Sequence, residues 1–564
     1  MLNIKEISSL IEGEVDTSSK ALESASHDAS IFEVTPEVVV RPKNIDDIKK
    51  LVRYVTDHTG NGLSSKSQPR ISLTARSAGT DMTGGPLTQS IVVDFLKYFN
   101  HIIKVENGYA VTEPGVYYRD FDKATLAKGQ IMPSYPASRE ICTVGGMVAN
   151  NSGGEKTLTY GKTERYIRRL KMVCADGKEH EFRPLSMHEL EQQKKFPSFE
   201  SEIYRRMHEL IVNNREIIEK ARPTVSKNSC GYYLWNVMGA REGIGENHGL
   251  DTGKEKYFDL TKLIVGSQGT LGLITEIEFT LVKPKPYSRL LVVFLKDLKL
   301  LAPTASHILK FKPESFESYD DHTFKVAFKF LPQLLKQMGG NIFKLGFSFI
   351  PEVWAVLRGG VPKMVLMAEF TADTEEQALN MATRARDSLK EFHEESRVTQ
   401  NAEDAHKYWV IRRESFNMLR HHVKKLRTAP FIDDFAVLPE KLTDFLPRLY
   451  SILDQYKLTY TIAGHIGDGN FHIIPLMNLH ETHSHEVIKE LSVKVYELIH
   501  EFKGTITAEH NDGMIRTPFI KMQYGEEMYK LFEQVKKIWD PKGIFNPGKK
   551  VGGDWEYAMG KVVK

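Results

Sequence analysis

Short apolar runs separated by Gly-rich turns dominate the chain from about residue 31 to residue 280. β-Branched residues fill these runs, which is typical of strands. The strands predicted on this basis are Ile71–Ala75, Ile91–Phe95, Tyr109–Thr112, Leu170–Cys174 and Leu273–Leu281. A helical spacing of apolar residues appears instead at Asn44–Asp57 and at Glu200–Ala221. The pattern therefore predicts a mixed α+β lobe.

Two breaks in this pattern suggest how the chain is divided. A polar, Gly-rich stretch at about 241–256 has no periodicity, so we interpret it as a surface loop inserted before a strand-like run at Lys262–Gly266. The sequence Lys283-Pro284-Lys285-Pro286 disfavours both helix and strand, because proline lacks an amide donor and restricts the residue before it. The predicted divisions are an N-terminal segment at 1–34, a first domain at 35–284 and a second domain at 285–564.

Strand-like and helix-like runs alternate in the second domain. The predicted pairs are Leu290–Leu295 with Thr304–Phe311, Met364–Phe370 with Glu375–Glu394, and Phe431–Val437 with Glu440–Tyr456, followed by a strand at Thr459–Ala463. Such units predict an α+β domain with helices on one face of a sheet.

Composition and charge narrow the class of protein. With 564 residues the chain exceeds the size of a single core, and its formal net charge of +3 supplies no case for nucleic-acid binding. Cys142, Cys174 and Cys230 are too far apart for a metal knuckle or an iron–sulfur motif, so a reducing cytoplasm fits best. Charges interrupt the N-terminal residues and every apolar run is too short to cross a bilayer, so we expect no export and no transmembrane segment.

Three Gly-rich loops mark the first domain. The first, Arg76–Gly85, follows a predicted strand, and its small residues allow backbone N–H groups to approach a phosphate. Taken alone, this segment favours a simple Gly-rich turn over a phosphate site, because neither GxGxxG nor GxxxxGK[ST] is present. The second loop spans Pro136–Gly161 and the third spans Gly266–Thr275. Three such loops in one domain predict a large ligand that lies across them.

Histidines and a carboxylate cluster in the second domain. A Gly-rich turn carries His465 and His472, and Glu509 and His510 follow a strand-like run at Gly504–Thr507. Imidazole and carboxylate suit a borderline divalent metal, and catalytic sites usually use three protein ligands. Because adjacent strand residues point to opposite faces, Glu509 and His510 divide naturally into one ligand and one base. Chance proximity remains the alternative, because the chain has 20 histidines.

The three loops, in this order, closely resemble the FAD-binding (PCMH-type) domain of the vanillyl-alcohol oxidase and MurB superfamily. That resemblance implies that the first loop wraps the pyrophosphate, the second lines the flavin and the third closes the site. The residues it assigns to FAD are Arg76, Ser77, Ala78, Gly79, Thr80, Asp81, Pro136, Ser138, Thr143, Gly145, Gly146, Asn150, Gly153, Gly154, Tyr160, Gly161, Gly269, Ile274 and Asn546.

Two features of these loops qualify the resemblance. The first loop reads Arg-Ser-Ala-Gly-Thr where many relatives have three consecutive glycines. It contains no His or Cys that could tether the flavin. We therefore predict noncovalent FAD, with Cys142 acting as a small packed hydrophobe.

The second domain resembles the C-terminal, ferredoxin-like α+β domain of FAD-linked oxidases, in the branch of D-lactate, glycolate and D-2-hydroxyglutarate dehydrogenases. The matching motifs are GHxGDGNxH at 464–472, the Glu-His pair at 509–510 and Asn546-Pro547-Gly548-Lys549. This resemblance implies that His465, His472 and Glu509 bind Zn²⁺ or Mn²⁺ and that His510 is the base. The family continues with Gly-x-Gly, whereas Asn511-Asp512-Gly513 follows here, which leaves the loop shape open.

A helix around Trp409 resembles the family's Trp…Arg-Glu helix, in which an arginine pairs with the substrate acid. An arginine suits this role because its guanidinium offers two parallel donors to a carboxylate, and of Arg412 and Arg413 we favour Arg412. The alternative is a solvated helix face. Lys424, Lys425 and Arg427 are interpreted as surface charges.

The resemblance implies FAD-dependent oxidation of a small D-2-hydroxy acid, such as D-lactate, to the 2-oxo acid. The partner that reoxidises the flavin would be a quinone, a cytochrome, a separate iron–sulfur protein or an electron-transfer flavoprotein. The expected location is the cytoplasm, with any membrane association limited to peripheral contact at the inner face. Two alternatives are an alkyl-glycerone-phosphate synthase, which transfers a group without net redox, and a non-catalytic flavoprotein subunit.

Overall fold

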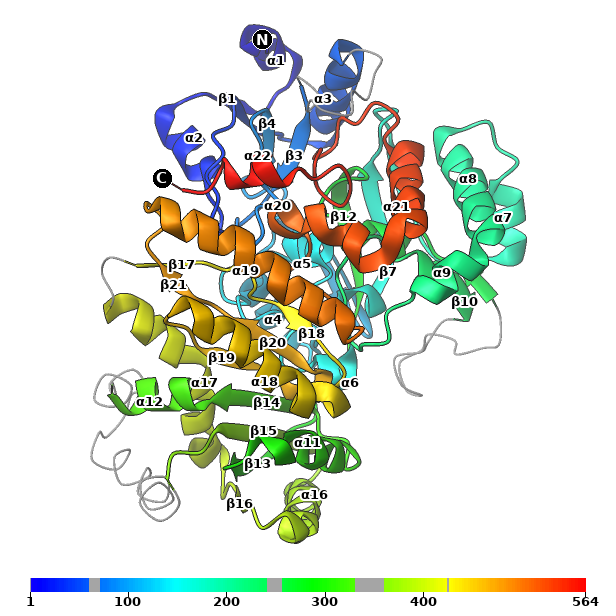
Figure 1. The fold of residues 1–564 in the computed structure, drawn as a ribbon. Helices are drawn as coiled ribbons and strands as arrows, with labels where there is room; N and C mark the ends of the chain where they lie inside the picture. Colours follow the sequence, from blue (N-terminus) through cyan, green and yellow to red (C-terminus); the bar gives the residue numbers. More distant parts are fainter. Residues whose placement is uncertain (1, 60–70, 241–255, 330–359, 423–425, 564) are drawn as a thin grey trace.

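The computed structural model describes residues 2–59, 71–240, 256–329, 360–422 and 426–563. Figure 1 shows two lobes, with the N-terminal half of the chain at the top and most of the C-terminal half below it. The last segment of the chain, drawn in red, returns to the upper lobe. The predicted loop at 241–256 lies outside the described residues except for Lys256, which begins β11 (Lys256–Phe258).

A four-stranded sheet begins the upper lobe, in the order β1-β2-β4-β3. Its strands are β1 (Glu14–Asp16), β2 (Val38–Arg41), β4 (Ile91–Asp94) and β3 (Leu73–Arg76). β2 and β3 both pair with β4 in parallel, which requires a crossover. The crossover contains α3 (Ile45–His58), which is capped by Asn44 and buries Ile48, Leu51, Val52 and Val55. The helix predicted at Asn44–Asp57 is thus confirmed.

A five-stranded antiparallel sheet, in the order β5-β6-β12-β7-β8, forms the rest of the upper core. The strands are β5 (Ile102–Glu106), β6 (Tyr109–Thr112), β12 (Leu273–Thr280), β7 (Ile167–Val173) and β8 (Glu179–Phe182). The helices of this lobe are α1 (Ile4–Leu10), α2 (Ser19–Ser26), α4 (Tyr118–Leu126), α5 (Val144–Asn150), α6 (Thr157–Tyr160), α7 (Met187–Gln193), α8 (Phe199–Asn213), α9 (Arg215–Ala221) and α10 (Thr261–Ile264). A small sheet joins β9 (Leu185–Ser186), β11 and β10 (Met238–Ala240).

The lower lobe is built on a seven-stranded antiparallel sheet, in the order β16-β13-β15-β14-β19-β20-β18. Its strands are β16 (Glu395–Val398), β13 (Tyr287–Leu295), β15 (Met364–Ala372), β14 (Ser315–Asp320), β19 (Ile462–His465), β20 (Asn470–Ile473) and β18 (Phe435–Ala436). β17 (Arg427–Thr428) pairs with β21 (Leu476–Met477) beside this sheet. The predicted α+β organisation is confirmed.

Helices cover both faces of this sheet rather than the one face predicted. Along β13, Leu291, Val293 and Leu295 join the core that includes α11 (Leu301–Leu309), α16 (Glu375–Ser388) and α18 (Leu442–Leu453). The alternate residues of β13 join a second core with α12 (Asp321–Lys329) and α17 (Ala402–His422). Successive side chains of a strand point to opposite faces, so a nearly continuous apolar run such as β13 requires cover on both.

Several predicted elements differ from those observed. The strand-like run at Lys262–Gly266 contains a helix, α10, which shows that a short buried apolar run does not distinguish strand from helix. The helix predicted at Glu200–Ala221 is divided by Asn214, whose ψ of 24° and φ of −120° are not helical. Gly504–Thr507 forms no regular strand, and only a single bridge joins Thr505 to Ala436.

α19 (Thr482–Glu501) packs on α18 of the lower lobe, and the chain that follows it packs against the upper lobe. This last segment contains α20 (Gly513–Arg516), α21 (Ile520–Trp539) and α22 (Trp555–Met559). Backbone bonds join Leu73 to Ile544 and Asn546, and Val563 to Ile31. Residues that follow the lower sheet in sequence therefore help to build the upper lobe (Figure 1).

Candidate functional site

A cavity of about 630 Å³ lies where the two lobes meet. Residues from all three Gly-rich loops of the upper lobe line it, together with residues of α17, β19 and β20 and with Glu509 and His510. Of the residues assigned to FAD by sequence, those that line the cavity are Arg76, Ser77, Gly79, Thr80, Asp81, Pro136, Ser138, Thr143, Gly145, Gly146, Asn150, Gly153, Gly269 and Ile274. A volume of this size is typical of a cofactor site.

Hydrogen bonds hold the three loops together around the cavity. The hydroxyls of Ser77 and Thr143 are 2.6 Å apart and join the first loop to the second. Asp81 accepts from the side-chain amides of Asn150 and Gln268, at 3.0 and 3.2 Å, and so joins all three loops. Gly145 packs on the backbone of Pro114, where a β-carbon would lie 2.6 Å from the carbonyl oxygen. Polar contacts between the loops thus fix their relative positions.

Five residues assigned to FAD do not line the cavity: Ala78, Gly154, Tyr160, Gly161 and Asn546. Asn546 supports the site from behind, because its amide donates to the carbonyls of Gly85 and Gln268. Tyr160 donates from its hydroxyl to Glu314 at 3.2 Å and so joins the two lobes. The position of a residue within a sequence motif does not reveal whether its side chain faces the cavity.

The lower part of the cavity brings together His465, His472 and Glu509. One ligand atom from each lies within 4.8 Å of the others. Glu509 Oε2 is 3.5 Å from His465 Nε2 and 3.8 Å from His472 Nε2. The three residues suggested as ligands therefore lie together, His465 on β19, His472 on β20 and Glu509 in the loop that follows α19. This donor set of two imidazoles and a carboxylate fits a divalent metal such as Zn²⁺.

The other ring nitrogen of each imidazole has an acceptor. His465 Nδ1 lies 2.7 Å from Glu317 Oε1, and His472 Nδ1 lies 3.1 Å from the carbonyl oxygen of Asp433. Donation from Nδ1 leaves the Nε2 lone pair directed at the shared centre, which is the arrangement of metal-binding histidines. Burial and the neighbouring His510 lower the pKa of His472 to about 4, so this imidazole is neutral, as a ligand must be.

Glu509 is held as a carboxylate by a buried lysine. Burial alone would raise the pKa of Glu509. The positive charges of Lys227 and His465 outweigh that effect and hold this pKa well below its usual range. Lys227 Nζ is fully buried and lies 2.6 Å from Glu509 Oε1, and it also approaches Asp468 at 3.4 Å. Glu509 therefore presents Oε2 to the histidines while Oε1 is neutralised.

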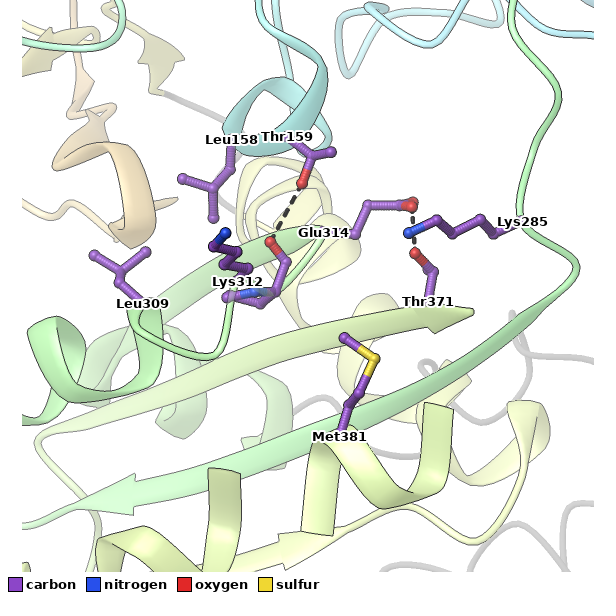
Figure 2. Close-up of a pocket in the computed structure, with 9 residues that line it drawn as sticks. Leu158, Thr159, Lys285, Leu309, Lys312, Glu314, Thr371 and Met381 are labelled. Carbon is purple, nitrogen blue, oxygen red and sulfur yellow. Dashed lines mark hydrogen bonds between the residues drawn. The ribbon is translucent and has the colours of Figure 1, made fainter. Parts of the chain in front are cut away.

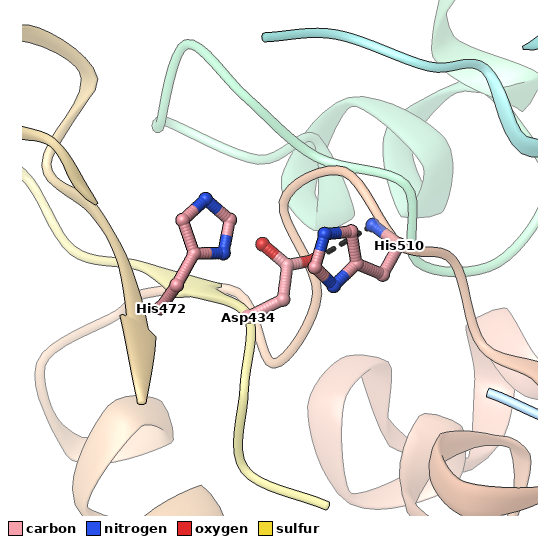
Figure 3. Close-up of side chains that lie close together, drawn as sticks. All are labelled: Asp434, His472 and His510. Atoms are coloured by element: carbon pink, nitrogen blue, oxygen red, sulfur yellow. Dashed lines mark hydrogen bonds between the residues drawn. The ribbon is translucent and has the colours of Figure 1, made fainter. Parts of the chain in front are cut away.

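His510 stacks on His472, with ring centroids 5.1 Å apart and an angle of 20° between the rings (Figure 3). Its Nδ1 lies 2.5 Å from Asp433 Oδ2, and Arg516 holds the other carboxylate oxygen of Asp433. Among the described residues no group hydrogen bonds to Nε2 of His510. Burial lowers the pKa of His510, but Asp434 and Asp433 raise it more, to about 9. The ring is thus oriented by a carboxylate, as acid–base histidines are.

Asp434, His472 and His510 form a second group of close donors (Figure 3). However, Asp434 Oδ2 already accepts from the backbone N–H groups of residues 508, 509 and 510 and from the hydroxyl of Thr507. Its Oδ1 accepts from the Asn470 amide at 3.0 Å. This carboxylate orders the loop that presents Glu509 and His510, so the first group fits a metal better.

Arg412 lies at the edge of the same cavity, on α17. Its guanidinium forms an ion pair with Glu317 and lies 3.5 Å from His465 Nδ1. The Nε atom of Arg412 is buried and has no acceptor among the described residues. Arg413 also lines the cavity, but its side chain is 40% exposed and pairs with Glu155 at 2.6 Å. Arg412 is thus the arginine that directly contacts the histidine cluster.

Four residues of the site were assigned no role from sequence: Glu317, Lys227, Asp433 and Asp434. Lys227 lies in the segment Val225-Ser226-Lys227-Asn228-Ser229-Cys230-Gly231-Tyr232, and nothing in that segment indicates its partner. Asp433 and Asp434 form an acidic pair inside an apolar run, which is a detectable signal because buried carboxylates require partners. Glu317 has no comparable signal, because it is one charged residue in a strand.

A second cavity, of about 420 Å³, lies between α6 of the upper lobe and the sheet of the lower lobe (Figure 2). Glu314 is its buried acidic group. Glu314 Oε1 lies 2.9 Å from Lys156 Nζ, and Oε2 accepts from the hydroxyls of Tyr160 and Thr371. These bonds satisfy the carboxylate, so we assign this cavity to the packing of the lobes.

No helix of the described residues is long and apolar enough to cross a membrane.

Comparison with known proteins places the two lobes in established families. Residues 36–183 match the family described as FAD binding domain, and residues 285–550 match FAD linked oxidases, C-terminal domain. The chain is 24% identical over 534 residues to D-2-hydroxyglutarate dehydrogenase of Pseudomonas putida. The aligned region covers 93% of this chain and 49% of that protein. It therefore spans about half the length of that relative.

Two shorter relatives are covered almost completely. Glycolate oxidase subunit GlcD of Bacillus subtilis is 25% identical to this chain, and the aligned region covers 94% of this chain and 92% of that subunit. D-lactate dehydrogenase of Archaeoglobus fulgidus is 25% identical over 91% of each chain.

Solved structures share the fold. p-Cresol methylhydroxylase has a TM-score of 0.64 at 14% identity and covers 98% of this chain and 96% of its own. Alkyldihydroxyacetonephosphate synthase has a TM-score of 0.62 at 13% identity, over 96% and 84% of the two chains. With an FAD binding domain and the C-terminal domain of FAD linked oxidases matched in that order, the chain belongs to the FAD-linked oxidases.

Proposed function

We propose that this protein oxidises a small D-2-hydroxy carboxylic acid to the 2-oxo acid, using noncovalent FAD and a divalent metal. One observation carries the proposal: His465, His472 and Glu509 converge in the same cavity as the three FAD loops. An acid–base histidine and an arginine border the same space. The relatives named for D-2-hydroxyglutarate, glycolate and D-lactate support this substrate class.

The chain would bind both functional groups of the substrate, the carboxylate and the hydroxyl. Arg412 has a buried Nε without an acceptor among the described residues, which a substrate carboxylate would satisfy. His465, His472 and Glu509 would hold Zn²⁺ or Mn²⁺ close to Arg412. When bound, FAD supplies a hydride acceptor and the metal lowers the pKa of a hydroxyl.

His510 would accept the hydroxyl proton through Nε2, while Asp433 fixes the ring and stabilises the imidazolium that forms. With a pKa of about 9, His510 is mainly protonated at neutral pH and unable to act as a base. A cation at the neighbouring ligands would favour the neutral ring, because like charges disfavour each other. The proposed base therefore depends on the metal.

Bound FAD would need a separate acceptor for the electrons that it takes from the substrate. We propose a quinone, a cytochrome, an iron–sulfur protein or an electron-transfer flavoprotein, because the three cysteines of this chain, Cys142, Cys174 and Cys230, are far apart in sequence and do not match the spacing of an iron–sulfur motif. Any membrane contact would be peripheral, at the inner face.

Four variants test the proposal. His465→Ala, His472→Ala and Glu509→Ala should each lose bound metal and keep FAD, because the three Gly-rich loops that would hold FAD belong to the upper lobe. His510→Ala should keep the metal but reduce its flavin ~10²- to 10⁴-fold more slowly, the usual contribution of a positioned acid–base group. Metal analysis and anaerobic stopped-flow absorbance measure both. If His510→Ala loses metal as the others do, the base assignment is wrong; if none loses metal, the metal site is wrong.

A further inference from the structure

We propose that Glu317 is a positioning residue that connects recognition of the substrate acid to binding of the metal. This inference rests on the proposed function. Glu317 lies on β14, and its side chain has no exposure to solvent. β14 pairs with β19, so Glu317 reaches the end of the strand that carries His465. No sequence motif suggested this residue.

The two oxygens of Glu317 serve two different groups. Oε1 lies 2.7 Å from Nδ1 of His465, and Oε2 forms an ion pair with the guanidinium of Arg412. His465 is 6% exposed and Arg412 is 9% exposed, so water does not compete strongly for either bond. One buried carboxylate therefore sets the orientation of both a metal ligand and the acid-binding arginine.

The bond to His465 has a predictable effect on the metal. An imidazole that donates Nδ1–H to a carboxylate is fixed in one tautomer, with its Nε2 lone pair aimed at the metal, and it becomes a stronger ligand. Loss of such a partner usually lowers metal affinity about 10- to 100-fold. Glu317 should therefore strengthen metal binding even when no substrate is present.

The bond to Arg412 has a separate effect on the acid. Glu317 occupies one terminal nitrogen of the guanidinium and leaves Nε without an acceptor among the described residues. A guanidinium held at one edge is restricted in rotation, so its remaining donors are oriented before the acid arrives. Without Glu317 the apparent KM for the acid should rise, in addition to the loss of metal.

Loss of a residue with only a structural role would not both weaken metal binding and raise KM for the acid. Glu314 is the matched control, because it precedes the same strand, its side chain is 3% exposed, and it pairs with Lys156 rather than with the site. Glu314→Gln and Glu317→Gln each remove one buried, ion-paired carboxylate. Only Glu317→Gln should change metal binding.

The experiment measures Mn²⁺ binding by equilibrium dialysis of the full-length, FAD-loaded protein without substrate, followed by KM for D-lactate at saturating Mn²⁺. We expect Glu317→Gln to bind Mn²⁺ about 10- to 100-fold more weakly and to show a raised KM, with Glu314→Gln unchanged in both. Mn²⁺ affinity equal to the parent's in Glu317→Gln would overturn the positioning role alone. A parent protein that binds neither Mn²⁺ nor Zn²⁺ would overturn the proposed function as well.

A second variant is used if Glu317→Gln yields too little folded protein. The double variant Glu317→Met/Arg412→Met leaves no unpaired buried charge from this pair, and such apolar replacements are often tolerated. It still removes the acceptor of His465 Nδ1. It should therefore bind Mn²⁺ about 10- to 100-fold more weakly than the parent, and parental affinity would overturn the proposal.

Discussion

Removal of Lys227 should make the stability of this protein depend on metal. Lys227 is fully buried, lies 2.6 Å from Glu509 and approaches Asp468, which is 3% exposed. Lys227→Met keeps most of the volume but leaves both carboxylates without their cation. Breaking a buried ion pair in this way costs about 3–5 kcal/mol. For a 564-residue chain that unfolds as one unit, this corresponds to a decrease in Tm of roughly 3–4 °C.

Added metal should recover much of this loss, because a cation between Glu509 and the histidines replaces the missing positive charge. Binding at ~100 times Kd stabilises the folded state by about 2.7 kcal/mol. The assay is thermal unfolding of the FAD-saturated variant, with a chelator and with excess Zn²⁺ or Mn²⁺. Lys536→Met is the control, because Lys536 is also buried and pairs with Asp540 at 2.6 Å, away from the site.

Without metal, both lysine variants should show a lower Tm than the parent. Added metal should raise the Tm of both, because both keep His465, His472 and Glu509, but it should raise that of Lys227→Met more, where it also replaces the missing cation beside Glu509. Unchanged Tm in metal-free Lys227→Met would refute the reasoning about the buried pair. An equal rise in both variants would show that the metal does not replace the charge of Lys227.

Three further predictions concern the flavin, the acid and a distant histidine. FAD should be released when the protein is denatured by acid or heat, and flavin that stays on the chain would implicate Cys142. Arg412→Lys should raise KM for a 2-hydroxy acid and leave FAD affinity unchanged in titrations, because an ammonium cannot replace a fork of donors; unchanged KM would point to Arg413. Burial lowers the pKa of His180, but Asp176 and Glu200 raise it to about 9. Since this exceeds the usual ~6.5, His180 should stabilise the fold below pH ~6.5 and lose that effect as the pH rises through 9. Urea unfolding of His180→Ala should show a deficit at pH 6 that is absent at pH 10, and an equal deficit at both would contradict the assignment.

The elements with the clearest periodicity were predictable from sequence. The amphipathic stripe of α3 and the strands β6 and β12 appear at or near their predicted positions. α10 was not predictable, because its short apolar run is buried whether it forms a strand or a helix. Cover on both faces of the lower sheet was missed because two helices far apart in sequence, α12 and α17, form the second layer.

Some residues of the site were likewise predictable from sequence, and others were not. His465 and His472 lie in one short motif whose turn was expected to bring them together, whereas Glu509 lies in a separate motif and was grouped with them through the family resemblance. Glu317 lies 148 residues before His465 and reaches it only through the pairing of β14 with β19. Lys227 comes from the other lobe. Supporting residues depend on how distant strands and lobes pack, and a single sequence does not contain that information in a local pattern.

A 2-hydroxy acid should reduce the FAD that this protein binds. The direct measurement is the visible absorbance of the FAD-bound, metal-loaded protein, mixed anaerobically with D- and L-forms of lactate and 2-hydroxyglutarate and with glycolate. We expect bleaching by at least one D-2-hydroxy acid or by glycolate, with formation of the matching 2-oxo acid, and we expect bleaching to be ~10²- to 10⁴-fold slower in His510→Ala. A flavin that stays oxidised with every one of these acids would contradict this expectation and would favour group transfer without net redox.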